Sequence, residues 1–323
     1  MPGMFSEVRA HDVLSAARRL AGVARHTALR RSTALGAIAG CDVYLKLESE
    51  QITGSFKLRG AYNLIASLPD DVRERGVVAS SAGNHGLGVA WASHHFGIPA
   101  TIFVPETAPR VKREGIAALG ATVDAESPHY DAAMERAIVF AEERGATFVH
   151  PCTGRDLLAG QGTVAAEVLE ELPELRTLVV PVGGGGLLGG CGALLRNVAP
   201  GVRIVGAQSV NTAAMARSLE AKAIVHIPSV PTLADGLAGD IDDIALDIGL
   251  QALDEIHTVA EEAIGRAIAW LAREEELVVE GAGAVGVAAI LEHEVARPEG
   301  PLAIVVSGGN IDRERHESLL ERW

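Results

Sequence analysis

A lysine placed among small and apolar residues is the first candidate for chemistry. Lys57 lies in the run GSFKLRG, residues 54–60, directly after an aromatic residue and close to two glycines. A lysine amine that apolar surroundings keep neutral can attack a carbonyl carbon. Lys57 is therefore predicted to be a nucleophile, and the rest of the chain should provide a site for a molecule that carries a carbonyl group.

Three predicted strands run into turns that are rich in glycine. The runs are VVASSAGNHG at residues 77–86, LVVPVGGGGLLGG at 178–190 and AIVVSGGN at 303–310. In parallel sheets, ligands bind at the carboxyl ends of the strands. The three turns are therefore predicted to form one shared site.

The second turn, GGGGLL, is the strongest candidate for binding phosphate. Its glycines let backbone N–H groups face a ligand, and the helix predicted to follow adds the positive end of its dipole. The alternative is a tight strand-to-helix turn with close packing. No Lys-Ser or Lys-Thr pair follows, so the run is not a P-loop. A dinucleotide site would also need an acidic residue about 20 positions later, and none is there.

The other two turns offer hydrogen-bond donors. SSAGNH, residues 80–85, has two hydroxyl groups and places Asn84 at the start of a predicted helix. An Asn or Ser there can cap the helix or bind a ligand, and SGGN at 307–310 has the same two readings. A reactive lysine, a phosphate site and such donors together fit an aldehyde that carries a phosphate. Pyridoxal phosphate (PLP) is such a molecule, with Lys57 as its Schiff-base lysine.

Short apolar runs alternate with longer helical patterns along the chain. Strands are predicted at residues 77–81, 100–104, 121–125, 147–150, 178–182, 203–208, 256–259 and 302–307. Helices are predicted at 84–96, 111–119, 130–144, 160–172, 188–198, 261–273 and 282–293. This alternation predicts an α/β fold with parallel sheets that helices cover on both faces. Two such series predict two domains with a ligand site between them and a boundary near residues 150–155.

Composition excludes several partners. With 28 Lys and Arg against 42 Asp and Glu, the formal net charge is -14, which argues against nucleic acid and anionic membranes. The uncharged residues 177–195 include seven glycines and a proline, so they are not predicted to span a membrane. The three cysteines are far apart without metal-binding spacing, which predicts reduced thiols and a cytoplasmic protein.

Four motifs together resemble a known family. GSFKLRGA, SSAGNHG, PVGGGGLLGG and VVSGGN occur in the order seen in serine/threonine dehydratases and serine racemases, PLP enzymes of fold type II. The resemblance covers nearly the whole chain. It implies a larger domain of residues 1–76 and 152–323, a smaller domain of residues 77–151, PLP in the cleft between them, and a homodimer.

The resemblance also implies a role for each motif. Lys57 would hold PLP and remove the substrate α-proton, Asn84 would bind the ring hydroxyl, and Ser307 would face the pyridine nitrogen. Further positions implied to contact the cofactor are Phe56, Gly183, Gly184, Gly185, Gly186, Leu187, Gly236 and Glu280. Glu280 has an open alternative as a charge at a helix start. Positions implied to bind the substrate are Ser81, Ala82, Gly83, Asn84 and His85.

Five positions depart from patterns in the family. Racemases resemble S-S-G-N-H, whereas this chain has Ala82 in place of the second serine, which predicts weak or absent racemisation. Members that bind a divalent cation have two carboxylates where this chain has Gln208 and Ala214, so no metal site is predicted. Cys152 and Leu87 are expected near the substrate side chain, where the small Cys152 would admit a bulkier substituent.

The function predicted from these features is a PLP-dependent ammonia-lyase. It would convert a β-hydroxy-α-amino acid of the threonine or serine type into a 2-keto acid and ammonia, with bulkier 3-hydroxy amino acids as further candidates. Alternatives within enzymes are a β-replacement synthase, a threonine synthase and a racemase. From another class, the alternative is a PLP-binding protein without catalytic activity.

Overall fold

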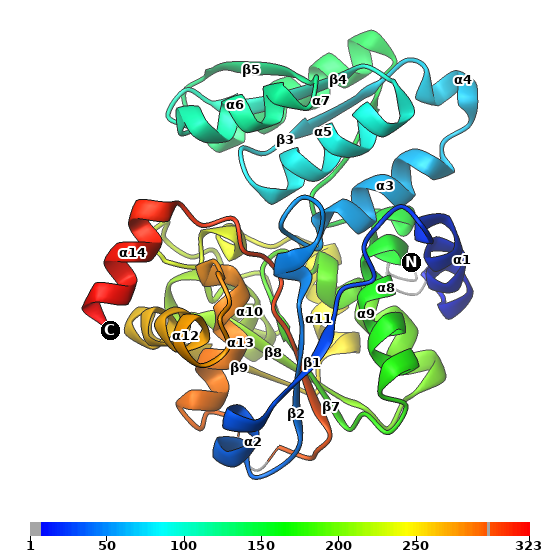
Figure 1. Cartoon of the computed structure of the whole chain (residues 1–323). Helices are drawn as coiled ribbons and strands as arrows, with labels where there is room; N and C mark the ends of the chain where they lie inside the picture. Colours follow the sequence, from blue (N-terminus) through cyan, green and yellow to red (C-terminus); the bar gives the residue numbers. More distant parts are fainter. Residues whose placement is uncertain (1–7, 296–297) are drawn as a thin grey trace.

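The chain folds around two sheets (Figure 1). The computed structural model describes residues 8–295 and 298–323. The larger sheet has the order β1-β2-β10-β7-β8-β9, from β1 (Leu29–Ser32), β2 (Val43–Lys46), β7 (Thr177–Pro181), β8 (Arg203–Ser209), β9 (Glu255–Val259) and β10 (Leu302–Val305). The smaller has the order β5-β4-β3-β6, from β3 (Val77–Ser80), β4 (Ala100–Pro105), β5 (Thr122–Ser127) and β6 (Thr147–Phe148). Neighbouring strands are parallel except β1 and β2, which confirms the predicted α/β fold.

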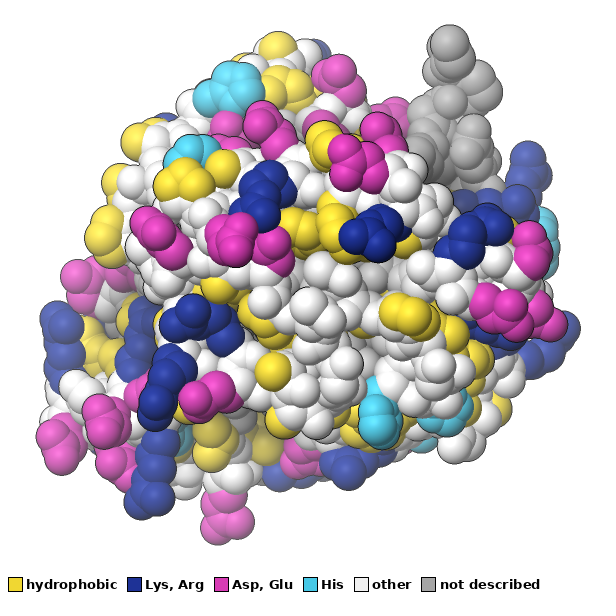
Figure 2. All heavy atoms as spheres, turned by 90° about the horizontal axis from the view of Figure 1, so that it is seen from above, with side chains coloured by type: hydrophobic (Ala, Val, Ile, Leu, Met, Phe, Trp, Pro, Cys, Tyr) yellow, Lys and Arg dark blue, Asp and Glu magenta, His cyan; other side chains and the backbone are white. Residues whose placement is uncertain are grey.

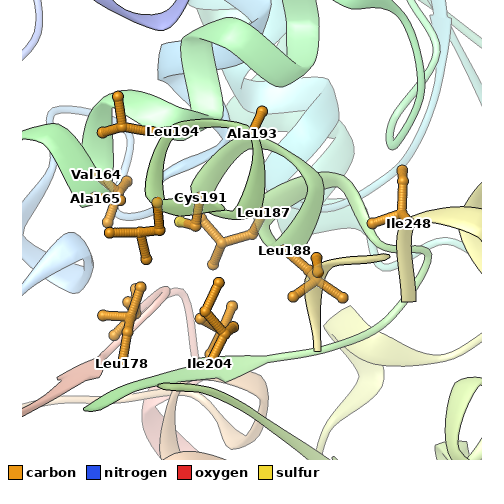
Figure 3. Packing of buried hydrophobic residues seen from close by; sticks show 14 of the residues in the cluster. Val164, Ala165, Leu178, Leu187, Leu188, Cys191, Ala193, Leu194, Ile204 and Ile248 are labelled. Carbon is orange, nitrogen blue, oxygen red and sulfur yellow. The ribbon is translucent and has the colours of Figure 1, made fainter. Parts of the chain in front are cut away.

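Helices cover both faces of the larger sheet. Leu178 and Val180 of β7 pack into one core and Val179 into the other, because successive side chains of a strand point to opposite faces. Figure 3 shows Leu178 and Ile204 directed toward the apolar side chains of α9. The first face is covered by α1 (Ala10–Leu20), α8 (Arg155–Glu171), α9 (Gly186–Val198), α10 (Ala214–Ala221) and α11 (Asp243–Ala252). The second is covered by α2 (Thr33–Ala39), α12 (Glu261–Glu274), α13 (Gly281–Leu291) and α14 (Arg313–Arg322).

The smaller sheet is also buried on both faces. Val77 and Ala79 of β3 join one apolar cluster, whereas Val78 joins another. The first cluster includes residues of α3 (Lys57–Ser67), α5 (Asn84–Phe96) and α6 (Arg110–Ala118). The second includes residues of α7 (Tyr130–Arg144). A single turn of helix, α4 (Asp70–Arg73), connects α3 to this sheet.

The helices predicted at residues 84–96 and 130–144 match α5 and α7, and the other predicted strands and helices are present at shifted ends. The largest shift is at α8, which begins at Arg155 and not at residue 160. The prediction omitted the antiparallel pair β1 and β2. It omitted the helices α1, α2, α3, α4, α10, α11 and α14, so the helix that Lys57 begins was not predicted. It also omitted the 3-10 turns η2 (Glu48–Glu50), η3 (Val210–Thr212) and η4 (Asp235–Leu237).

Helix α3 lies between the two sheets and packs closely against its neighbours (Figure 1). A Cβ atom at Gly160 of α8 would lie 2.7 Å from the Cα of Gly60, so α3 and α8 touch through their backbones. A Cβ atom at Gly88 of α5 would lie 3.2 Å from the backbone carbon of Lys57. Because only glycine permits such approaches, these two positions hold the first turn of α3 between α8 and α5.

A buried group of charged side chains connects α3 to its neighbours. Arg59 donates to both carboxylate oxygens of Glu48 at 2.8 Å and to those of Glu167 at 2.6 and 2.8 Å. Lys46 donates to Glu167 at 2.5 Å and to the carbonyl of Thr27 at 2.6 Å. Although burial acts to raise it, the pKa of Glu48 is lowered by the charge and hydrogen bonds of Arg59. Two cations and two carboxylates thus compensate one another where each has little contact with water.

The surface carries charges of both signs. Seen from above, Lys and Arg side chains are interspersed with Asp and Glu (Figure 2). Among residues 8–295 and 298–323, no helix combines the length and the apolar character needed to cross a membrane.

Candidate active site

Lys57 is the first residue of helix α3, which lies between the two sheets. Its Nζ donates to the carbonyl oxygen of Pro151 at 2.8 Å and lies 5.3 Å from the centre of the Phe56 ring. The Phe56 N–H donates to the carbonyl of Ser307 at 3.1 Å, and Ser55 forms a β-bridge with Gly308. The GSFK and SGGN runs are thus paired through their backbones, although about 250 residues separate them.

The four glycines form the turn between β7 and α9. Gly185 has a φ of 82°, a left-handed conformation that favours glycine. A Cβ atom at Gly184 would lie 2.7 Å from Cys152 Sγ, and one at Gly183 would lie 3.0 Å from the Cα of Leu237. The turn is therefore tightly packed on its outer side. The start of a long helix also leaves its first N–H groups without partners inside the helix, so both readings of the sequence apply to this turn.

Asn84, Glu280 and Asn310 form a hydrogen-bonded group next to these turns. Asn84 Nδ2 donates to Glu280 Oε1 at 2.7 Å, and Asn310 Nδ2 donates to Asn84 Oδ1 at 2.7 Å. A side chain at Gly308 would collide with Glu280, and a Cβ atom at Gly236 would lie 3.9 Å from Glu280 Oε1. The predicted positions Asn84, Gly236 and Glu280, which come from distant segments, are thus brought together.

Glu280 is both a helix cap and a buried carboxyl. It precedes α13 as the N-cap residue, which the helix-charge alternative anticipated. Burial raises its pKa to about 7, and the charge of Asp235 adds to this effect, while the hydrogen bond from Asn84 opposes it. Asp235 in turn lies 3.5 Å from Lys112 of α6, an ion pair between the two sheet units. Near neutral pH, Glu280 can therefore exchange a proton.

The SSAGNH turn leads from β3 into α5. Ser81 Oγ accepts from the N–H of Gly83 at 3.1 Å, which tightens the turn. Ala82 is half-buried and packs against the apolar cluster of the smaller sheet. His85 is 2% exposed, and its Nε2 donates to the carbonyl of Val149 at 2.9 Å. Burial lowers the pKa of His85 to about 3, with the charge of Lys57 adding to the effect, so this imidazole stays neutral and provides no cation.

Two further predicted positions face packed regions of the protein. Leu87 packs with the core of the smaller sheet, and its Cδ2 would lie 3.7 Å from a Cβ atom at Gly115 of α6. Cys152 lies with its Sγ against Gly184 and its backbone against Gly186. Cys152 thus supports the glycine turn directly.

Sequence reasoning missed several residues of the site. Asn310 ends the SGGN motif that was quoted, so the motif itself was a signal for it. Asp235 precedes Gly236, but its effect on Glu280 needs the folded chain. The Pro151 carbonyl is a backbone group that no residue type reveals.

The residues present fit pyridoxal phosphate. The glycine turn at the start of α9 leaves no side chain between its backbone and a phosphate group. The buried hydroxyl of Ser55 has no partner within the described residues, and that of Ser307 has a long contact of 3.4 Å to the carbonyl of Ala282. An amine, a glycine turn at the start of a helix and polar groups able to bind a ring therefore adjoin one another.

Gln208 has a structural role. Its Nε2 donates to the carbonyl of Thr212 at 2.9 Å, and its Oε1 accepts from the N–H of Ala216 at 3.0 Å. Both ends of this fully buried amide are satisfied by the backbone. Within residues 8–295 and 298–323, no three His, Cys, Asp or Glu side chains are grouped as metal ligands.

Comparisons with known proteins identify the family of this chain. Residues 20–308 match the model of the pyridoxal-phosphate dependent enzyme family. The chain is 44% identical to an L-threonine ammonia-lyase of Thermotoga maritima, over 96% of this chain and 78% of that protein. It is 36% identical to a catabolic L-threonine dehydratase of Staphylococcus aureus, over 96% and 91% of the two chains. Maize serine racemase matches with a TM-score of 0.92 and 32% identity, over 98% of this chain and 97% of that one. By its sequence, its fold and the family model that covers most of its length, this chain belongs to the pyridoxal-phosphate dependent enzymes.

Proposed function

We propose that the protein is a PLP-dependent ammonia-lyase acting on a β-hydroxy-α-amino acid of the threonine or serine type. The observation that carries the proposal is the position of Lys57. Its Nζ donates to the carbonyl of Pro151, in the turn that packs against the glycines after β7. The names of relatives at 36% and 44% identity, an L-threonine dehydratase and an L-threonine ammonia-lyase, support this reaction over the alternatives.

Each segment of the site has a task in this reaction. Bound pyridoxal phosphate supplies an electron sink for the negative charge that develops at the substrate Cα. The turn Gly183–Gly186 and the start of α9 would hold its phosphate, Asn84 would bind its ring hydroxyl, and Ser307 would lie at its ring nitrogen. The residues proposed to complete its surroundings are Phe56, Leu187, Gly236 and Glu280.

The substrate is bound and deprotonated by two segments. The backbone N–H groups of the turn that includes Ser81, Ala82, Gly83, Asn84 and His85 would bind the carboxylate. Lys57 would remove the proton from Cα, and hydroxide would then leave Cβ, which together amounts to loss of water. The released enamine becomes an imine, and its hydrolysis gives a 2-keto acid and ammonia. The protein's contribution is to hold the Cα–H bond toward Lys57.

The test measures the near-ultraviolet and visible spectrum of the purified protein together with keto acid production. L-serine, L-threonine and bulkier 3-hydroxy amino acids are added in turn. A band of lysine-bound PLP that shifts on addition and yields keto acid is expected. A shift without keto acid would favour the synthase, racemase or non-catalytic alternatives, and no band after adding PLP would contradict the proposal.

Two lysine variants make the test specific. Lys57→Arg keeps the charge but cannot bind PLP covalently, so the band and the keto acid should both disappear. Lys222→Arg is the matched control, because Lys222 is an exposed residue at the end of α10. It should behave as the unmodified protein does.

The surroundings of the enzyme are part of the proposal. We assign residues 77–151 to a smaller domain and residues 1–76 and 152–323 to a larger one, of which 1–7 and 296–297 lie outside the described residues. A homodimer in the cytoplasm fits the family resemblance and the free thiols of Cys41, Cys152 and Cys191. Sedimentation of the purified protein tests the homodimer, and fractionation of cells tests the location.

A further inference from the structure

The chain leaves the smaller sheet through a turn built around one imidazole nitrogen. His150 Nδ1 accepts from the N–H of Cys152 at 3.2 Å and from the N–H of Thr153 at 3.0 Å. The hydroxyl oxygen of Thr153 lies 2.8 Å from the same nitrogen. Asp and Asn side chains stabilise turns in this way when they accept from N–H groups two and three residues ahead. Here the acceptor is a histidine, which can accept at Nδ1 only while that nitrogen is unprotonated.

This turn touches both parts of the site. Between its first and third residues lies Pro151, whose carbonyl accepts from Lys57 Nζ at 2.8 Å. The third residue, Cys152, packs against Gly184 and Gly186 of the glycine turn. The imidazole of His150 therefore fixes the segment that faces the reactive amine on one side and the glycine turn on the other.

We infer that His150 is a positioning residue, whose unprotonated Nδ1 holds the Pro151 carbonyl against the amine of Lys57. The inference rests on the proposed function only in taking Lys57 as the reacting amine. His150 acts on Lys57 only through the turn and takes no part in making or breaking bonds.

The charges around His150 favour the unprotonated form. Burial lowers the pKa of His150, and the positive charge of Lys57 on α3 adds to this, while Asp242 at the start of α11 opposes it. His85 of α5, whose own pKa is lowered by the same lysine and by His150, brings no charge. On β6, the Phe148 ring lies edge-on to the imidazole at 6.3 Å. Protonation would place an N–H against the backbone N–H groups of Cys152 and Thr153, so the turn should open only on the acid side of the ordinary histidine range.

The test compares two replacements of His150. His150→Asn keeps an acceptor that can reach the same N–H groups, whereas His150→Leu removes it. The matched control is His129→Leu, because His129 Nδ1 accepts from the Ala132 N–H at 3.3 Å at the start of α7, where its side chain is exposed. Thr153→Val removes one donor and serves if His150→Leu does not fold.

The first readout uses the protein without PLP. An amine reagent labels the lysines, and mass spectrometry of peptides gives the labelling rate of Lys57 relative to Lys222. Without the Pro151 carbonyl as its hydrogen-bond acceptor, the Lys57 amine is no longer held in place and should be labelled roughly tenfold faster in His150→Leu. The rate should change by less than about threefold in His150→Asn and His129→Leu, and Thr153→Val should lie between the two groups.

The second readout is the pH profile of the enzyme with PLP. His150→Leu should lower kcat with little change in KM, and His150→Asn should restore kcat and lose the acid limb that His150 contributes. Equal Lys57 labelling in His150→Leu and the unmodified protein would overturn the inference, as would an equal defect in the Leu and Asn variants. Labelling needs no substrate, so a protein that makes no keto acid but shows the expected labelling would refute the lyase function and leave the positioning role intact.

Discussion

Asn84 and Glu280 join the two sheet units through a hydrogen bond of 2.7 Å between Nδ2 and Oε1. Asn84 begins the helix after β3 of the smaller sheet, and Glu280 caps a helix of the larger one. Asn310, from the loop after β10, completes the contact by donating to Asn84. Two of the glycine-rich turns therefore meet in the folded chain, as the sequence predicted for all three.

Glu280 should make stability depend on pH near neutrality. Its pKa is about 7 in the folded chain and about 4.5 in an unfolded one, so the folded form binds more protons between these values. The contribution of Glu280 to the free energy of unfolding is complete below pH 4.5. It is lost as the pH rises through 7, by at most about 1.4 kcal/mol per pH unit. Urea unfolding of Glu280→Gln without PLP should lack this loss. The exposed Glu317→Gln is the control, and a parallel pH dependence in all three proteins would contradict the prediction.

Arg59 should be costly to replace. Arg59→Met leaves the buried carboxylate of Glu48 without its cation, and breaking a buried pair in this way typically costs about 3–5 kcal/mol. The double variant Arg59→Met/Glu48→Gln should recover part of the loss. Arg313→Met removes an exposed ion pair within α14 and should change the free energy of unfolding by less than about 1 kcal/mol. Urea unfolding tests all three, and similar costs for Arg59 and Arg313 would refute the role of the buried group.

The effects of substituting Gly184 and Cys152 on PLP affinity should depend on each other. Gly184→Ala places a Cβ atom 2.7 Å from Cys152 Sγ, so either the glycine turn or the Cys152 side chain must shift. We expect the turn to move and PLP to bind at least about tenfold more weakly. Cys152→Ala removes the sulfur and should restore part of the affinity in the double variant. Fluorescence titration of PLP into the apoprotein measures both effects. Unchanged affinity in Gly184→Ala would show that the turn does not bind the phosphate.

Ala82→Ser should add racemase activity. The hydroxyl would stand where the family's racemases have a second serine, on a turn that adjoins Asn84. Chiral chromatography of L-serine after incubation should show D-serine with this variant and little with the unmodified protein. Ala82→Val, which adds bulk without a proton donor, is the control. No gain with serine would count against the explanation given for Ala82.

Chelation should leave the activity intact. Gln208 uses its amide to hold the backbone at Thr212 and Ala216, and it has no negative charge to offer a cation. Activity after dialysis against EDTA should equal that before dialysis. Loss that Mg²⁺ restores would contradict this prediction.

The sequence predicted the repeated strand and helix pattern because periodic apolar residues record local structure. It did not predict the partners of Arg59, since Glu167 is 108 positions away and belongs to another layer. The SGGN motif pointed to the site but not to the contact of Asn310 with Asn84, which spans 226 positions. The buried, neutral state of His85 likewise depends on its neighbours in space. Motifs thus indicated a candidate site, whereas contacts between distant residues determine its charges.

Both connections between the sheets lie beside Lys57. Helix α3 begins there on the way into the smaller sheet, and the return connection passes Lys57 at Pro151. A rotation axis through these two connections would pass beside the Lys57 amine. Any rotation of the smaller sheet about that axis would therefore displace the amine less than residues farther from the two connections.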